Sequence, residues 1–277
     1  MKTNTKIFIA KIIYFFLSFF LLKKILLIRR NGINWSLDLS EGIDLSIFLF
    51  GSFQSRITDS IVKLISKKKK LRFNIIDIGS NIGDKALTLS HKLIKKNIQN
   101  FKIYSIEPTD FAYNKQIINL NLNPKLKKKI SIFKSIISNK KKIPNSIYSS
   151  WNLKQKKNRH KVHGGILKRI DKKTKISTLD SFIKKNKIKN NVILKIDTDG
   201  YEMEILKSFQ NYIKKSNPII FMEYAPYALK EYGTSIDYFY SFLSKNNYQV
   251  FDLKLNKIDK IKIREGSSVD IVLIKNI

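Results

Sequence analysis

From about residue 72 onwards, short apolar runs alternate with longer segments in which apolar residues recur at helical spacing. Seven runs have the length and the β-branched content of buried strands, near residues 74–78, 101–106, 130–137, 192–197, 219–223, 248–252 and 269–274. A helical pattern follows most of these runs, but no long one separates the last two. The pattern therefore predicts an α/β fold: a mostly parallel, seven-stranded sheet with helices on both faces and an antiparallel hairpin at one edge.

The first of these strands leads directly into a glycine turn. The segment Asp77-Ile-Gly79-Ser80-Asn81-Ile-Gly83 is followed by a helical pattern that runs to about residue 97. We expect Gly79 to allow a sharp turn, Gly83 to let the helix pack closely on the strand, and Asn81 to adopt left-handed geometry cheaply. Such a unit opens nucleotide- or nucleoside-binding sheets, although any turn between a strand and a helix can share the pattern. A phosphate-binding P-loop is excluded, because the Gly-Lys-Ser/Thr ending is absent.

The next two strands add candidate ligand contacts at the same edge of the sheet. The second strand ends in Glu107, a position from which a carboxylate can accept both hydroxyls of a ribose. The alternative is an acid that only caps a neighbouring loop. The third strand is followed by Ser138, where a base ring can meet polar groups.

A second dense motif, residues 192–202, ends the fourth strand. Lys195 and Asp197 point the same way on a strand, so both can face a ligand crevice at its carboxyl end. Asp199 and Glu202 follow, with Gly200 making the turn. Three other interpretations stay open: Asp197 only ties down the turn, Asp197 and Asp199 hold a divalent ion, or Glu202 complements the dipole of the next helix.

The first 30 residues form a segment of their own. An uninterrupted apolar run of 11 residues, 12–22, lies between lysines and is shorter than the roughly 20 residues that span a bilayer. We expect either a helix at the membrane interface, attached to a cytoplasmic face, or a helix packed on the domain; a cleaved signal ranks third. Residues 31–70 are expected to form a cap over the sheet or the pocket mouth, and residues 71–277 the main domain.

Composition narrows the function classes. The absence of cysteine excludes disulfides, cysteine-ligated zinc and a thiol nucleophile. The net charge of +33 is spread along the whole chain, which favours solvated lysines over a nucleic-acid interface. His160 and His163 have the spacing of metal ligands on a helical turn, but their loop context favours a solvated or substrate-facing pair.

Beyond these local features, the chain resembles the FkbM family of class I S-adenosylmethionine-dependent methyltransferases, which have a Rossmann-like sheet. The resemblance covers about residues 72–275 and leaves the N-terminal 70 residues outside. Its most specific part is the Lys-Ile-Asp-x-Asp/Glu-Gly-aromatic-Glu segment. It rests on five pieces in the family's order: Asp77–Gly83, Glu107-Pro108, Thr178–Phe182, Lys195–Glu202 and Met222-Glu223. Two departures are mild, since Ser80 stands where the family more often has Ala and Asp199 where Glu is commoner.

The resemblance implies O-methylation of a hydroxyl on a sugar, a glycan or a secondary metabolite. S-adenosylmethionine is then the cofactor, held by Asp77, Gly79, Ser80, Asn81, Gly83, Glu107 and Ser138. We expect Asp197 to orient the acceptor hydroxyl and take its proton, with Lys195 beside it and Asp199 or Glu202 in support, and we assign no metal. The alternatives are a nicotinamide-linked oxidoreductase on the same sheet and a non-catalytic basic module that binds an anionic glycan or lipid. No nucleic-acid partner is expected.

Overall fold

The protein is built around one seven-stranded sheet. The computed structural model describes residues 3–20, 25–140, 144–155, 157–189 and 191–275. The strand order is β12-β13-β11-β10-β3-β4-β5. These strands are β3 (Phe73–Ile78), β4 (Phe101–Ile106), β5 (Ile130–Phe133), β10 (Val192–Ile196), β11 (Ile219–Tyr224), β12 (Tyr248–Phe251) and β13 (Val269–Lys275). The seven predicted strands are therefore all present in the sheet.

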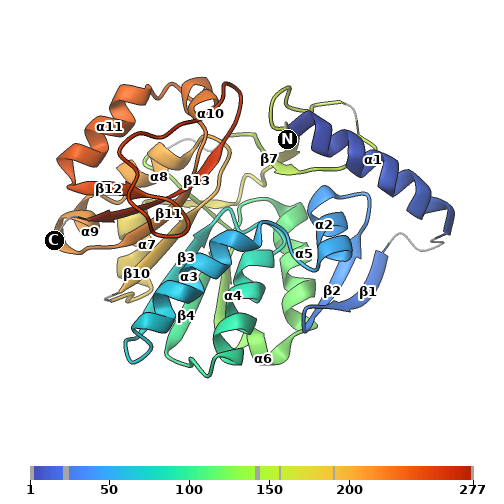
Figure 1. The fold of residues 1–277 in the computed structure, drawn as a ribbon, viewed down its shortest axis with the longest axis horizontal. Coiled ribbons are helices and arrows are strands. Elements are labelled where there is room, and N and C mark those ends of the chain that lie inside the picture. The colour runs from blue at the N-terminus through green and yellow to red at the C-terminus, as the bar shows by residue number, and fades with distance from the viewer. Residues whose placement is uncertain (1–2, 21–24, 141–143, 156, 190, 276–277) are drawn as a thin grey trace.

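Strand β13 is antiparallel to both of its neighbours, and the other pairings in the sheet are parallel. The antiparallel hairpin that was predicted at the sheet edge is thus confirmed. It places β13 between β11 and β12, so that β12 is the edge strand (Figure 1). β3 lies between β10 and β4 in the sheet, and these three strands are parallel. The turns that follow them therefore lie together at the carboxyl ends of the strands.

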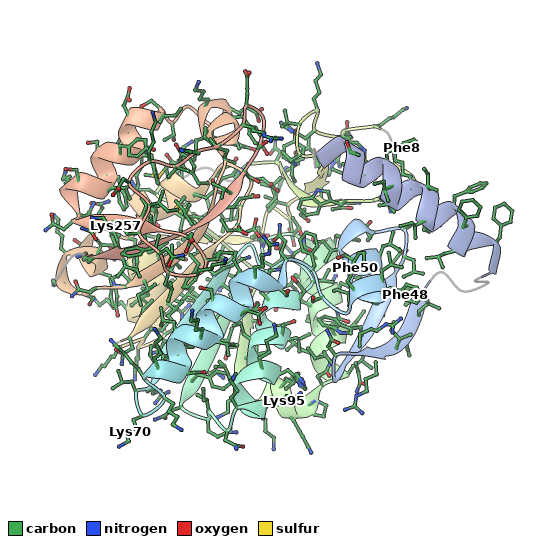
Figure 2. The ribbon with its side chains drawn as sticks, in the orientation of Figure 1. Phe8, Phe48, Phe50, Lys70, Lys95 and Lys257 are labelled. Atoms are coloured by element: carbon green, nitrogen blue, oxygen red, sulfur yellow. The ribbon has the colours of Figure 1, made fainter. Side chains whose placement is uncertain are left out.

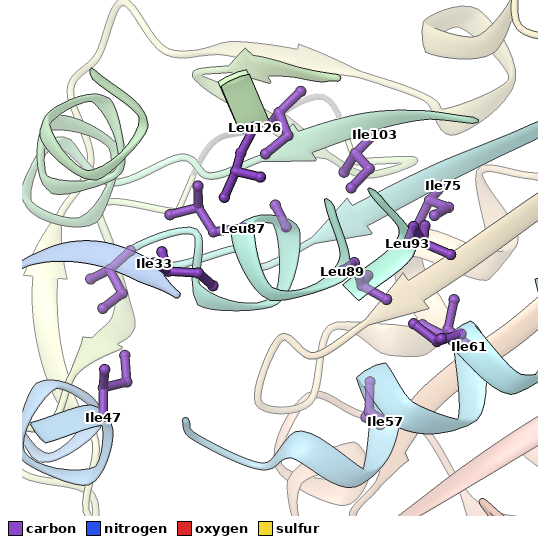
Figure 3. Close-up of a cluster of buried hydrophobic side chains, with 14 of the residues drawn as sticks. Ile33, Ile47, Ile57, Ile61, Ile75, Leu87, Leu89, Leu93, Ile103 and Leu126 are labelled. Carbon is purple, nitrogen blue, oxygen red and sulfur yellow. The ribbon is translucent and has the colours of Figure 1, made fainter. Parts of the chain in front are cut away.

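Helices cover both faces of the sheet. On one face lie α2 (Gly42–Phe50), α3 (Ser55–Lys67), α4 (Asp84–Lys95), α5 (Asp110–Asn121) and α6 (Pro124–Lys127); on the other lie α7 (Leu179–Lys185), α8 (Glu202–Lys207), α9 (Gln210–Lys215), α10 (Pro226–Glu231) and α11 (Ile236–Lys245). The alternation of strand residues produces the two cores, since Ile75 packs into the first and Ile76 into the second. Figure 3 shows the first core, in which Ile57 and Ile61 of α3 face Leu89 and Leu93 of α4.

One predicted strand is divided in two. Residues 130–137 were expected as a single strand, but β5 ends at Phe133 and β6 (Ser135–Ile137) leaves the sheet. β6 pairs with β9 (Lys175–Ser177) instead, while β7 (Ser146–Ser150) pairs with β8 (Ile166–Arg169). Between the two pieces, Lys134 turns outward to pair with Asp110 and Asp171. The break sends the following segment over the carboxyl end of the sheet.

The N-terminal segment contains a helix and a strand. Helix α1 (Thr3–Phe20) is followed by the hairpin of β1 (Ile25–Arg30) and β2 (Ile33–Asp38). Ala10, Ile13 and Leu17 of α1 pack against the first core, so one face of this helix is a packed face. Within the region expected as a cap, β2, α2 and α3 contribute to that same core.

Candidate active site

A cavity of about 550 Å³ lies at the carboxyl ends of β3, β4, β10 and β11. Both sequence motifs reach it. Among its polar lining residues are Gly79, Asn81, Glu107, Lys195, Asp197, Asp199 and Glu223. We call the first three the cofactor end of the cavity, and Asp197, Asp199 and Glu223 the acceptor end. Lys195 lies between the two ends.

The glycine turn brings the two motifs into contact. Gly79 has a φ of 76°, and a Cβ there would lie 2.0 Å from the backbone oxygen of Asp197. Asn81 also has left-handed geometry, with a φ of 48°, and its side-chain amide donates to the carbonyl oxygen of Ser149. Gly79 is therefore required for close backbone approach as well as for the turn.

Glu107 is held in place by its own loop. It is 3% exposed; its Oε1 accepts from the backbone N–H and the hydroxyl of Thr109, and its Oε2 accepts from the N–H of Asn81. Burial raises the pKa of this carboxyl, and these hydrogen bonds oppose the rise. Three donors leave at least one lone pair of the carboxylate for a ligand hydroxyl.

Lys195 is buried at the centre of the site. Its Nζ lies 3.0 Å from Oδ1 of Asp77 and 3.5 Å from Oδ2 of Asp197, and the side chain is 2% exposed. It also donates to the carbonyl oxygen of Gly79 at 3.2 Å. Burial acts to lower the pKa of Lys195, but the charges of Asp77 and Asp197 outweigh it and raise that pKa above its ordinary value. The ammonium therefore stays charged and links the two motifs.

The acidic residues of the second motif lie in two different places: one holds the turn, and two line the cavity. Glu202 is 1% exposed, and its Oε1 accepts from the N–H and hydroxyl of Thr198 and from the N–H of Gly200. It therefore holds the turn, which was one role considered for Asp197. The side chain of Asp197 is 26% exposed and that of Asp199 is 14% exposed, and both line the cavity.

Two cavity residues come from outside the sequence-predicted site. Glu223 is the last residue but one of β11 and lies one position beyond the parallel partners Ile196 and Met222, which puts it beside Asp197. Burial and the neighbouring charges of the acceptor end raise the pKa of Glu223 and of Asp199 well above their ordinary values. Tyr227 follows in α10, and burial and Glu223 raise its pKa too. The signal for Glu223 was its place at the end of a parallel strand; Tyr227 had no such signal.

The other sequence-predicted residues lie around the cavity without lining it. Asp77 is fully buried beneath Lys195, Glu202 lies behind the turn, and Ser80 and Ser138 are buried beside the lining. The expectation for Gly83 is corrected. It is the N-cap residue directly before α4, with a φ of 80°, and a Cβ there would meet the side chain of Gln116 in α5, so the close approach is to a helix and not to the strand.

The two histidines stack on each other at the edge of the site. Their ring centroids are 3.8 Å apart, and His160 Nε2 lies 2.9 Å from a carboxylate oxygen of Glu231. His163 is 8% exposed, lines the cavity, and accepts at Nδ1 from the N–H of Gly165. Burial and the neighbouring His160 lower the pKa of His163 to about 4, so it is neutral at pH 7. In the described part of the chain, no three His, Asp or Glu residues are arranged to hold a metal ion.

The cofactor end has the groups that a nucleoside ligand needs. Glu107 presents a carboxylate with a free lone pair, the turn at Gly79 keeps side chains out of the way, and the cavity volume is within the usual range for small-molecule sites. Lys195 neutralises the buried carboxylate of Asp77, so the floor of the cavity carries no uncompensated charge from that acid. These residues fit S-adenosylmethionine.

Three solved structures to which the chain is similar are methyltransferases by name. An FkbM methyltransferase from Methylobacillus flagellatus KT has a TM-score of 0.43 and 17% identity, over 74% of this chain and 44% of that protein. This chain thus matches less than half the length of that protein. A magnesium protoporphyrin IX methyltransferase from Synechocystis PCC 6803 with bound SAM has a TM-score of 0.41 and 10% identity, over 80% of this chain and 79% of that one.

A third structure, a SAM-dependent methyltransferase from Aquifex aeolicus, has a TM-score of 0.39 and 14% identity, over 80% of this chain and 93% of that one. No curated protein sequence matches the chain. The family model of the methyltransferase FkbM domain matches residues 77–250, which is more than half of the chain and contains both motifs. The chain therefore belongs to the FkbM family of methyltransferases, and its cofactor is S-adenosylmethionine.

Proposed function

We propose that this methyltransferase transfers a methyl group to a hydroxyl oxygen of a sugar, a glycan or a secondary metabolite. The observation that carries the proposal is the acceptor end of the cavity, where Asp197, Asp199 and Glu223 converge beside a charged Lys195. Carboxylates accept hydrogen bonds from hydroxyl groups, and one of them can take the proton that the hydroxyl must lose.

The chain's residues have separate tasks in this proposal. When bound at the cofactor end, S-adenosylmethionine would supply the methyl group of its sulfonium, and the neutral thioether would be the leaving group. Asp197 orients the acceptor hydroxyl and receives its proton. Lys195 keeps the carboxylate of Asp197 in place. Burial and the neighbouring acidic charges raise the pKa values of Asp199 and Glu223 at the same end of the cavity.

The cofactor-binding role extends to residues around the lining. We assign Glu107, Gly79 and Asn81 to direct contact, because they line the cavity. We assign a supporting role to four residues that lie around the cofactor end without lining the cavity: Asp77, Ser80, Gly83 and Ser138. Glu202 has the corresponding role at the acceptor end, through its hydrogen bonds to the turn.

Methyl-labelled S-adenosylmethionine and a panel of hydroxylated acceptors test the proposal. The panel should contain free sugars, alkyl glycosides and phenolic compounds, with the matching amines and thiols as controls. Transfer to hydroxyl compounds alone supports O-methylation, whereas transfer to the amines or thiols in preference to the hydroxyls contradicts it. Calorimetric titration with the cofactor in the same preparation shows that the protein is competent to bind.

We also propose that α1 attaches the enzyme to the cytoplasmic face of a membrane. Phe8, Ile12, Phe15 and Phe19 recur at spacings of four, three and four, so they share a face opposite the packed face, and all are 42% exposed or more. Phe8 and Phe50 mark this end of the molecule in Figure 2. None of the described helices is both long and apolar enough to cross a bilayer, so the attachment proposed is interfacial.

Vesicle flotation tests this attachment. The full chain should float with vesicles that contain phosphatidylglycerol and less well with pure phosphatidylcholine, because the chain carries a net charge of +33. The double variant F15S/F19S should lose flotation while keeping cofactor affinity. A matched exposed-apolar variant on α5, I118S, should float like the parent protein; equal flotation of all three would contradict attachment through α1.

A further inference from the structure

Part of the cavity wall is apolar. This part is formed by α1, by α2 and by the segment after α2. We call this part the apolar branch and define it by six of its lining residues: Ile7, Ala10, Ile13, Ile43, Leu49 and Phe50. These side chains offer no hydrogen-bonding groups. A free sugar, whose groups are mostly hydroxyls, would therefore gain little from this wall.

Helix α1 forms one wall of the apolar branch. Ala10 and Ile13 lie on the face that packs on the domain. Ile7 also lines the cavity, and its Cδ1 would lie 2.2 Å from a Cβ on Gly164. Figure 1 shows α1 passing above α2. The N-terminal helix thus contributes directly to the cavity that contains the active site.

The apolar branch opens to the surface through an apolar rim. Ile9, Leu49 and Phe50 all line the cavity, and yet they are 41%, 37% and 74% exposed. Exposed large apolar residues at the mouth of a cavity favour an apolar ligand, because its burial removes their surface from water as well as its own. The outward face of α1 continues this apolar surface on the same helix.

The two ends of the cavity thus prefer opposite chemistry. The acceptor end, with Asp197, Asp199 and Glu223, suits a head group rich in hydroxyls and repels an anionic one. The apolar branch suits a hydrocarbon chain. Both occur along one continuous cavity, so a single ligand can satisfy both.

We infer that the methyl acceptor is an amphipathic molecule with a hydroxylated head group at the acceptor end and an alkyl or prenyl chain in the apolar branch beneath α1. The inference rests on the proposed function, because that function places the acceptor at Asp197. It adds the acceptor's class. The chain of the acceptor selects the substrate, and α1 is part of the substrate site.

A series of alkyl β-glucosides, from methyl to octyl and each below its micellar concentration, tests the inference. Trp151 lines the cavity and reports binding by fluorescence in the full chain once the other tryptophan is replaced by W35F. That change loses no hydrogen bond, since the indole N–H of Trp35 has no partner among the described residues. Affinity should rise about three- to fourfold for each methylene added, as expected for burial of a CH₂ group.

Two variants locate the chain-binding part. A10F fills the apolar branch and should abolish the gain in affinity from the longer chains without changing that for methyl glucoside. I12F adds a ring to the outward face of the same helix and should keep the full dependence on chain length. If A10F loosens α1, as a fall in its melting temperature would show, L49Q at the exposed rim provides the same test.

The possible outcomes separate this inference from the proposed function. A flat affinity series in the parent protein overturns the inference, and so does an unchanged slope in both A10F and L49Q, since the chain would then bind elsewhere. Calorimetry with S-adenosylmethionine is run on the same samples. Normal cofactor binding with a flat series removes only the amphipathic acceptor, whereas methyl transfer that ignores hydroxyl compounds removes the proposed function.

Discussion

The cofactor end and the acceptor end lie side by side on adjacent strands, but their acidic residues differ in exposure and in hydrogen bonding. Glu107 is 3% exposed and accepts three hydrogen bonds from its own loops. Asp197 is 26% exposed at the side chain and has the ammonium of Lys195 at 3.5 Å. The cofactor end is thus organised before a ligand binds, while the acceptor end keeps carboxylate oxygens available for one.

The difference matches the two kinds of ligand that the ends would hold. A cofactor that is the same in every turnover can be met by a rigid set of hydrogen bonds, which lowers the entropy lost on binding. An acceptor hydroxyl needs hydrogen-bonding groups beside it, and Asp197, Asp199 and Glu223 line the cavity at that end.

Replacement of Gly79 by Ala should have the largest effect, because Gly79 lies where the two ends touch. The new Cβ would lie 2.0 Å from a backbone oxygen of Asp197, at a φ of 76° that disfavours a side chain. We expect a loss of more than about 3 kcal/mol in the free energy of unfolding, measured by urea titration, and no measurable cofactor binding.

Gly233 provides the matched control for that substitution. Its φ is 75°, but a Cβ there would have no heavy atom within 4 Å. G233A should therefore lower the free energy of unfolding by only about 1 kcal/mol, because left-handed geometry alone disfavours the new side chain. If G79A and G233A lose the same stability, the close approach of the two ends is not what requires the glycine.

Asp197→Asn should have the next largest effect and should act on the acceptor end alone. The amide keeps the shape of the carboxylate but cannot take a proton, so turnover should fall 10²-fold or more once an acceptor is known. Affinity for S-adenosylmethionine should change little. Full activity of this variant would discard the catalytic role of Asp197, and loss of parent activity on treatment with chelators would favour a metal instead.

The sheet could be predicted from sequence because its signals are local. Buried strands such as residues 192–196 are continuous apolar runs, and the hairpin follows from the missing helix between the last two strands. The break after Phe133 was not foreseen, since an apolar run does not reveal where a strand changes partners. The second half of the predicted strand, β6, pairs with β9, and β9 lies about forty residues later in the sequence.

The candidate site was predicted in part, for the same reason. Glu107, Asp197 and Asp199 come from motifs that end their own strands, and the structure places all three in the cavity lining. The part played by α1 was not apparent, because a helix that is apolar on every side gives no sign of which side packs. Likewise, the difference between Glu202 as a dipole partner and as the residue that holds the turn depends on loop geometry.

Glu107→Ala tests the cofactor end. The substitution removes the acceptor for a ribose hydroxyl, and a hydrogen bond to a charged group is worth roughly 1.5–3 kcal/mol. Cofactor affinity measured by calorimetry should fall at least about tenfold. The loops around Thr109 and Asn81 lose a partner as well, so circular dichroism must show that the variant is folded. Unchanged affinity in a folded variant would remove Glu107 from the cofactor site.

Asp270→Asn should have the smallest effect, and it tests the electrostatics at the edge of the acceptor end. Asp270 pairs across the strands with Glu223, and burial, followed by the charge of Asp197, raises its pKa to about 6 from the ordinary 3.8. A carboxyl whose pKa is raised on folding stabilises the protein below the unfolded pKa and loses that contribution as the pH rises through the folded one. The ionised form is thus unfavourable in the folded protein at pH 7.5. The two pKa values differ by about two units, so D270N should be more stable there by at most about 3 kcal/mol.

The pH dependence distinguishes this effect from a simple change in packing. The advantage of D270N should shrink as the pH is lowered from 7 towards 4, because Asp270 in the folded parent protein takes up a proton across that range. D259N makes the same change in net charge at an exposed position and should show no such trend. Melting temperatures of the three proteins, measured at half-unit steps of pH, give the comparison. An advantage of D270N that is constant with pH, or that grows as the pH falls, would show that burial and the charge of Asp197 do not raise the pKa of Asp270.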